Sequence, residues 1–354
     1  MPIDTVEDLR AELQAAIQVE LTTVPPYLYA MYSIEDRANT ATKLIRSVAA
    51  EEMLHATLMA NVLLGVGGEP RFYDPEIMPR YPGPLPHHSP ELILELAPCT
   101  PDVVEEVFLT IERPGAPGAP DQLDAWESQG QLYHAVEHAI RRFDADGDLF
   151  ATPQRDRQLH DPHGYVTVKY DSTASGGLIV VDSLERAIEA TEVAVHQGEG
   201  LSDERFADPT HRELTHYSKF LMLLDGQVEI GAVHNAVHSP ALVSLPDQIQ
   251  PLAEFSNALY SYLFVLMDRL FAADTPDRHH LVGTLYGTMV ALLAPVARCL
   301  MTLPVSASEV AGPPFEYYEF GDVDHAEAEL RELGAALGSS HPSLAPSLAQ
   351  LDRL

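Results

Sequence analysis

Carboxylate and imidazole side chains recur at helical spacing near the start of this chain. Glu20 lies in QVELTTVPPYLYAMYSI, and Glu52 and His55 lie in SVAAEEMLHATLMANVL. Residues three apart share a helix face, so Glu52 and His55 can bind one ion together. A single Glu on one helix and Glu-x-x-His on the next supply half of the ligands of a dinuclear iron or manganese site.

The middle of the chain repeats this arrangement. Glu199 lies in QGEG, and Glu213 and His216 form a second Glu-x-x-His in RELTHYSKF. One such motif is common on solvated helix faces, whereas two, each preceded by an apolar helical segment that carries Glu, favour a metal site. Glu20 has little other charge around it, and burial of an unpaired carboxylate costs several kcal/mol, so Glu20 needs a cation.

The single ligand expected from the third helix has several candidates. Glu192, His196 and Glu199 are spaced i, i+4 and i+7 and therefore share one helix face. Glu137, in GQLYHAVEHAIRR, is a fourth candidate, although its neighbours favour an exposed charge. The spacing alone does not choose among these four residues.

Carboxylate oxygen and imidazole nitrogen together suit iron or manganese. The only cysteines, Cys99 and Cys299, lack the spacing of a thiolate zinc site or of a disulfide framework. Two ions that share carboxylate bridges can bind dioxygen and carry out a two-electron oxidation. We therefore expect two Fe ions, with manganese as the alternative, and dioxygen as a co-substrate.

The composition of the chain limits the kinds of molecule that it is expected to bind. The 354 residues contain 21 Lys and Arg against 53 Asp and Glu, a net charge of −32. A field of this sign repels nucleic acids and anionic membrane surfaces, so neither is an expected partner, whereas a homo-oligomer is compatible with it. The most apolar run, LVGTLYGTMVALLAPVARCLMTLP, contains Pro295 and Arg298 and is expected to be a buried helix of a soluble, cytoplasmic protein.

Apolar residues at helical spacing predict an all-α protein. A four-helix core is expected from two helix pairs, with a helical hairpin packed alongside and a Pro-rich, helix-free wrap at 69–90. We expect a dimetal bundle with inserted loops at 1–230 and a C-terminal helical extension at 231–354. The predicted helices are 4–35, 38–66, 100–112, 122–143, 183–198, 209–224, 250–273 and 278–302.

Pro25 and Pro26 follow Glu20 by little more than one helical turn. Proline removes a helical hydrogen bond, so the first helix either kinks here or ends at Val24 with a second helix starting at Pro25. A kink would open space for a substrate beside the metals. The walls of that pocket are expected to come from Tyr27, Met59, Tyr260 and Phe264.

Several segments together resemble the ferritin-like family, and most of all the ferritin-like domain associated with iminophenylpyruvate dimer synthases of violacein and indolocarbazole biosynthesis. They are ELTTVPPYLYAMYSI, EEMLHATLMANVLLGVGGEPRFYDP, YPGPLP, GQLYHAVEHAI, HQGEG, ELTHYSKF and AGPPFEY. The resemblance covers roughly residues 5 to 320 and implies a ferritin-like four-helix bundle with a dinuclear metal site. The implied ligands are Glu20, Glu52, His55, Glu199, Glu213 and His216. His196 stands where the family pattern has Glu, which leaves the third-helix ligand open.

The resemblance also implies an oxidative step in a natural-product pathway. We therefore expect a non-haem di-iron oxidase or oxygenase that acts on a small molecule, amino-acid-derived or otherwise aromatic. The alternatives are an iron-storage protein without catalytic activity and a metal-free scaffold of the same fold. The synthases are much longer than this chain, so their substrate does not transfer to it.

Overall fold

The structure is a computed structural model that describes residues 3–114, 128–160, 177–198, 214–273, 275 and 277–354. Its α-helices are α1 Val6–Ser33, α2 Thr40–Gly65, α3 Pro101–Val103, α4 Leu109–Ile111, α5 Gln129–Phe143, α6 Leu184–Gly198, α8 His216–Leu224, α9 Gln250–Phe271, α10 Arg278–Tyr286, α11 Ala294–Leu300, α12 Ala326–Leu337 and α13 Ala345–Leu348. Two π-helical segments are η1 Val104–Phe108 and η4 Gly287–Leu293, and the 3₁₀ turns are η2 Arg155–Arg157, η3 Leu242–Ser244, η5 Val323–His325, η6 Pro342–Leu344 and η7 Ala349–Arg353. The strands β1 Gly83–Pro84 and β2 Ile93–Leu94 pair antiparallel, with Gly83 opposite Leu94. The prediction of an all-α protein is confirmed.

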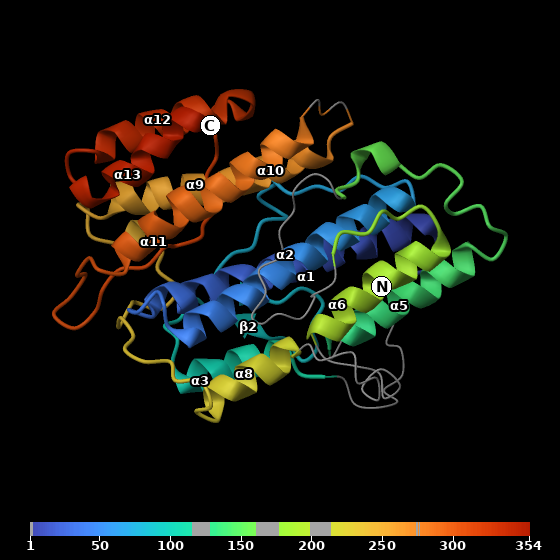
Figure 1. The fold of residues 1–354 in the computed structure, drawn as a ribbon, viewed down its shortest axis with the longest axis horizontal. Coiled ribbons are helices and arrows are strands. Elements are labelled where there is room, and N and C mark those ends of the chain that lie inside the picture. Colours follow the sequence, from blue (N-terminus) through green and yellow to red (C-terminus); the bar gives the residue numbers. More distant parts are fainter. Residues whose placement is uncertain (1–2, 115–127, 161–176, 199–213, 274, 276) are drawn as a thin grey trace.

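Helices α1 and α2 lie side by side through the centre of the bundle (Figure 1). Thr5 caps α1 through a capping box with Asp8, and Asn39 caps α2. From Leu13 to its end, α1 buries nearly every side chain, because other helices cover both of its sides. Both helices lie within two residues of the bounds predicted at 4–35 and 38–66.

The third and fourth positions of the bundle are each filled by shorter segments. Helices α5 and α6 pack on each other and against α1 and α2, towards one end of that pair (Figure 1). Near the other end, α3, η1 and α4 form a continuous helical stretch that packs against α8. The sequence predicted a helix from 122 and another from 209, but the described helices begin at Gln129 and His216.

The wrap at 69–90 contains no helix, as predicted, and ties the central helices to the C-terminal hairpin. The backbone amides of Phe72 and Tyr73 donate to the carboxylate of Asp268 on α9, at 2.9 Å each. The hydroxyl of Tyr81 donates to the carbonyl of Thr22 on α1, at 2.6 Å. A short β1–β2 ladder, which the sequence analysis did not foresee, closes the end of the wrap.

The predicted C-terminal hairpin consists of α9 followed by the continuous α10–η4–α11 helix, which α12 and α13 then cover (Figure 1). Among the described residues, Arg278–Leu300 is the one helix long and apolar enough to cross a membrane. A core helix of a soluble protein passes the same test, so this is weak evidence for a membrane span. The expectation of a buried helix is nevertheless wrong in part, because only 33% of its apolar window is buried. A division of the chain near residue 230 stays a prediction.

Candidate metal centre

Two groups of buried side chains converge between the central helices and the shorter ones. The first contains Glu20, Glu52 and His55, and the second contains Glu52, Glu112 and His216. In each group the potential ligand atoms all lie within 4.8 Å of one another. Glu52 belongs to both groups, which is the arrangement of two neighbouring ion sites with a shared carboxylate. We call these five residues the carboxylate–histidine cluster.

Helices α1 and α2 supply the first group. Nδ1 of His55 lies 3.4 Å from Oε2 of Glu20 and 3.4 Å from Oε2 of Glu52. The i to i+3 spacing on α2 places Glu52 and His55 on one face, and the pairing of α1 with α2 brings Glu20 to that face. The structure thus brings together the three residues that the sequence predicted for this half.

The second group depends on the ends of two short helices. Glu112 follows directly after α4, one turn beyond the π-helical segment η1, and His216 is the first residue of α8. Nδ1 of His216 lies 3.1 Å from Oε1 of Glu52 and 3.4 Å from Oε2 of Glu112. A π-helical turn inside an α-helix is frequent at functional sites, because it redirects the side chains that follow.

Both histidines are oriented by a partner on their other ring nitrogen. Nε2 of His55 lies 2.8 Å from Oε1 of Gln197, and Nε2 of His216 lies 2.9 Å from Oε2 of Glu51. Both partners offer an acceptor oxygen to Nε2, and Nδ1 of each ring faces the carboxylates of the cluster. Burial acts to lower the pKa of both histidines, but the neighbouring carboxylates outweigh it and raise the pKa of His55 and, further, that of His216. A histidine held at Nε2 in this way can bind a metal ion through Nδ1.

The carboxylates leave several buried atoms without a hydrogen bond. Tyr133 donates to one oxygen of Glu20, and Tyr27 donates to Oε1 of Glu112 at 2.5 Å. Oε2 of Glu20, both oxygens of Glu52, Oε2 of Glu112 and Nδ1 of His216 make no hydrogen bond. Buried acceptors without a partner are costly, and these converge on one place. The residues present therefore fit a pair of cations, and oxygen with imidazole nitrogen suits iron or manganese.

The electrostatics of the cluster agree with this reading. Burial and the charges of Glu112 and Glu20 raise the pKa of Glu52 well above its usual range. Burial acts to raise the pKa of Glu20 as well, but the nearby side chains of Glu52, His55 and Tyr133 outweigh it and lower that pKa to about 2. Three carboxylates this close together require a compensating positive charge, which a proton on Glu52 or a cation supplies.

A buried ion pair supports His216 from outside the cluster. The ammonium of Lys219 donates to Oε2 of Glu51, the same oxygen that accepts from His216, and both side chains are almost fully buried. Lys219 follows His216 by one helical turn on α8. The sequence analysis missed this pair, although the double Glu of AAEEMLH and the Lys of HYSKF were available signals.

The remaining predicted ligands either lie outside the described residues or do not belong to the cluster. Glu199 and Glu213 lie outside the described residues, so their roles stay predictions. Thr215 is the N-cap of α8, and His216 is the first residue of that helix. Glu137 instead accepts a hydrogen bond from Thr191 at 2.9 Å.

Glu192 and His196 lie on α6 but belong to neither cluster group among the described residues. Glu112 was not among the predicted ligands, but it belongs to the second group of the cluster. Its signal was present, because Glu112 is the one acidic residue that ends the apolar run VFLTIE.

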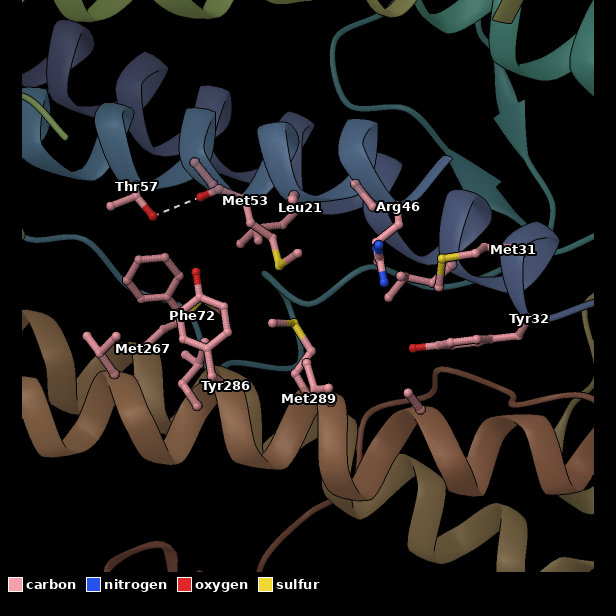
Figure 2. Close-up of a pocket in the computed structure, with 18 of the residues that line it drawn as sticks. Leu21, Met31, Tyr32, Arg46, Met53, Thr57, Phe72, Met267, Tyr286 and Met289 are labelled. Carbon is pink, nitrogen blue, oxygen red and sulfur yellow. Dashed lines mark hydrogen bonds between the residues drawn. The ribbon is translucent and has the colours of Figure 1, made fainter. Parts of the chain in front are cut away.

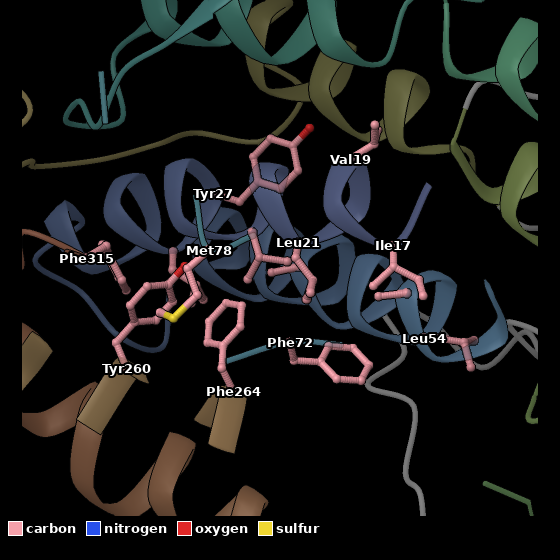
Figure 3. Packing of buried hydrophobic residues seen from close by; sticks show 14 of the residues in the cluster. Ile17, Val19, Leu21, Tyr27, Leu54, Phe72, Met78, Tyr260, Phe264 and Phe315 are labelled. Atoms are coloured by element: carbon pink, nitrogen blue, oxygen red, sulfur yellow. The ribbon is translucent and has the colours of Figure 1, made fainter. Parts of the chain in front are cut away.

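The structure decides between the two alternatives for the first helix. Helix α1 runs without interruption through Pro25 and Pro26, so the alternative of two separate helices is wrong. Figure 3 shows Tyr260 and Phe264 on one side of α1 and Tyr27 on the other, all within the hydrophobic core. Met59 is also buried in this core, and a substrate pocket beside the metals that these side chains would line stays a prediction.

The comparisons with known proteins agree with the fold and the cluster. A ferritin-like family model matches residues 13–225, and the chain belongs to the ferritin-like family. It is 25% identical to a 2-imino-3-(indol-3-yl)propanoate dimerase of Chromobacterium violaceum over 95% of this chain and 36% of that protein. It is 26% identical to a dichlorochromopyrrolate synthase of Lentzea aerocolonigenes over 90% of this chain and 36% of the relative.

A solved structure of a ferritin-like protein from Caulobacter vibrioides has the same fold. It superposes with a TM-score of 0.62 at 20% identity, over 88% of this chain and the whole of that protein. The chain spans about a third of the length of the two curated relatives it matches. The resemblance to the ferritin-like domains of natural-product enzymes, expected from the motifs, is confirmed.

Proposed function

We propose that this protein is a dinuclear metal oxidase or oxygenase that uses dioxygen to oxidise a small molecule in a natural-product pathway. Iron is the proposed metal, and manganese is the alternative. The observation that carries the proposal is the orientation of the two histidines. Nδ1 of both histidines lies 3.1 to 3.4 Å from buried carboxylate oxygens, and several oxygens of these carboxylates make no hydrogen bond.

Individual residues of the chain would have separate roles in such a site. Glu20 and His55 would hold one ion, Glu112 and His216 the other, and Glu52 would bridge them; Glu199 and Glu213 stay further candidates. When bound, the pair of ions supplies two-electron oxidation at the expense of dioxygen. Gln197 and Glu51 fix the rings, and the surrounding core excludes bulk water from the cluster, which is almost fully buried.

The substrate class is proposed from the relatives. One relative is named as a dimerase of 2-imino-3-(indol-3-yl)propanoate, an aromatic imine, and the other is named as a dichlorochromopyrrolate synthase. We extend only the class to this chain, because it matches about a third of each relative. A cytoplasmic location and a homo-oligomer stay predictions.

The test is metal loading followed by exposure to air. The protein, made in iron-supplemented medium, should contain about two ions per chain. After anaerobic Fe(II) loading, air should oxidise those ions and the stoichiometry should stay at two. His55→Ala should lower the metal content, whereas His279→Ala, an exposed histidine on α10, should not.

Two other outcomes would each indicate one of the alternative functions. A storage protein would form a ferric core of many ions per chain under the same protocol. A scaffold that keeps the fold alone would show no affinity for Fe(II) or Mn(II). Either result would contradict the proposed function.

A further inference from the structure

A cavity of about 570 Å³ separates the central helix pair from the C-terminal hairpin. Its walls come from α1 and α2 on one side and from α9, α10, η4 and α11 on the other (Figure 2). The lining is mostly apolar, and the sulfur atoms of Met53 and Met289 approach the middle of the cavity from opposite walls (Figure 2). This volume lies within the range of small-molecule sites, roughly 300 to 1,000 Å³.

The cavity and the carboxylate–histidine cluster lie on opposite faces of the α1–α2 pair. Leu21, Met53 and Ala56 line the cavity. Each of them directly follows a cluster residue in the sequence, namely Glu20, Glu52 and His55. The two helices thus stand between the two sites, and none of the five cluster residues lines the cavity.

Three arginines, Arg37, Arg46 and Arg298, line part of an otherwise apolar cavity. The side chain of Arg46 reaches into it from α2 (Figure 2). Within the part of the chain that the structure describes, none of the three forms an ion pair with a carboxylate. Among the described residues, no carboxylate therefore neutralises these guanidinium groups, and an anionic ligand can pair with them.

Arg298 is the most enclosed of the three. Its guanidinium lies 5.4 Å from the centre of the Tyr32 ring and donates to the carbonyl of Ile34 at 3.3 Å. Burial lowers the pKa of Arg298, and the positive charges of Arg37 and Arg46 lower it further. The three arginines therefore form a positive region at the cavity that an anion would stabilise.

The opposite wall contains apolar side chains that are incompletely packed. Leu285, Tyr286 and Met289 line the cavity and are only partly buried, and Val290 is 64% exposed. Methionine side chains adapt to ligands of different shape because they are flexible and polarisable. A bound apolar group would complete the packing of this helix against α2.

We propose that this cavity binds a small molecule with an apolar body and one carboxylate, the carboxylate paired with Arg46 and Arg298. The apolar part lies between Met53 and Met289, and Arg37 stands at the rim as a further positive charge. The site is separate from the metal cluster, so occupancy does not require metal. The apolar body is aliphatic or aromatic, and the two are distinguished by experiment.

Isothermal titration of the metal-free, full-length protein tests the proposal with three probes. Decanoate and 2-naphthoate supply the carboxylate on an aliphatic and an aromatic body, and decan-1-ol is the neutral control. At least one acid should bind with about 1:1 stoichiometry, and decanoate should bind about tenfold or more tightly than the alcohol if the aliphatic acid is the ligand. Binding of neither acid would overturn the proposal, and so would binding of decan-1-ol as tightly as a decanoate that does bind.

Variants locate the binding. Arg46→Gln combined with Arg298→Gln should weaken the acid about tenfold or more, whereas Lys43→Gln, which removes an exposed charge from the same helix α2, should not. Ala50→Leu fills the cavity while keeping the arginines, and should also weaken binding. If the double arginine variant folds and binds the acid unchanged, the anion site is not at this cavity.

Discussion

The two faces of the α1–α2 pair are built in opposite ways. On one face, Glu20, Glu52 and His55 are fully enclosed, and each has partners on other helices. On the other face, Leu21 and Met53 border a cavity that the C-terminal hairpin only partly fills. Adjacent residues in the sequence therefore contribute to two environments of opposite polarity, separated by the thickness of the helix pair.

The two faces also differ in how rigidly their side chains are held. Five side chains fix the geometry of the cluster, and Gln197, Glu51, Tyr27 and Tyr133 hold those side chains from outside. The cavity face has flexible methionines and half-buried apolar groups instead. A dinuclear site needs fixed distances, whereas a site for an apolar body tolerates adjustment.

The largest change is expected in the metal content after substitution of Glu52, the residue that both groups of the cluster share. Glu52→Gln should remove most of the bound metal, because both ions lose an anionic ligand. Met53→Leu, the next residue on the cavity face, should leave the metal content unchanged. Metal analysis of the two purified variants after the same anaerobic Fe(II) loading measures the contrast.

Circular dichroism should confirm that both variants keep their helices. If Met53→Leu lost as much metal as Glu52→Gln, the two faces would not be independent, and the separation drawn here would fail.

The second prediction concerns the buried ion pair behind His216. Lys219→Met should lower the free energy of unfolding by about 3 kcal/mol or more, because it leaves Glu51 buried without its ammonium partner. Urea denaturation of the metal-free protein measures this. The double variant Lys219→Met with Glu51→Gln should recover part of the loss, since the uncompensated charge is then gone.

An unchanged midpoint for Lys219→Met would mean that water reaches Glu51 and that the pair is not buried in solution. His216 would then lack the rigid support that the structure gives it. This prediction therefore tests how rigidly the metal face is built.

The sequence predicted the α1–α2 half of the cluster because long, uninterrupted helices keep the i to i+3 rule. Glu52 and His55 follow this spacing within α2, and the pairing of α1 with α2 brings Glu20 beside them. The other half lies where helices end, at the residue after α4 and at the first residue of α8. Helical spacing carries little information at such breaks, so Glu112 was not a predicted ligand. The pairing of Glu213 with His216 stays a prediction, because Glu213 lies outside the described residues.

The fold was more predictable than the cavity for a related reason. Apolar periodicity fixed the helices of the bundle and the hairpin, since each must bury one face. How closely two such faces approach depends on the packing of particular side chains. The cavity between α2 and α10 is a result of that packing and was not predicted.

The third prediction compares packing on the two kinds of surface. Ala50→Leu, which points into the cavity, should raise the free energy of unfolding by about 1 kcal/mol through additional apolar burial. Ala60→Leu, at a fully buried position on the same helix, should lower it by about 1 to 3 kcal/mol through overpacking. Thermal and urea unfolding of both variants measure the sign, and a loss of stability in Ala50→Leu would mean that the cavity is closed in solution.

The smallest change in the free energy of unfolding is expected at the contact between the wrap and α1. Pro26 has no amide hydrogen, so the carbonyl of Thr22 lacks its helical donor, and the hydroxyl of Tyr81 donates to it instead. Tyr81→Phe should therefore lower the free energy of unfolding by about 1 kcal/mol without a change in metal content. In a Pro26→Ala background the restored amide supplies that donor, so the same substitution should cost measurably less. Equal costs in the two backgrounds would show that Tyr81 stabilises the wrap for another reason, and that the proline-containing turn beside Glu20 does not depend on it.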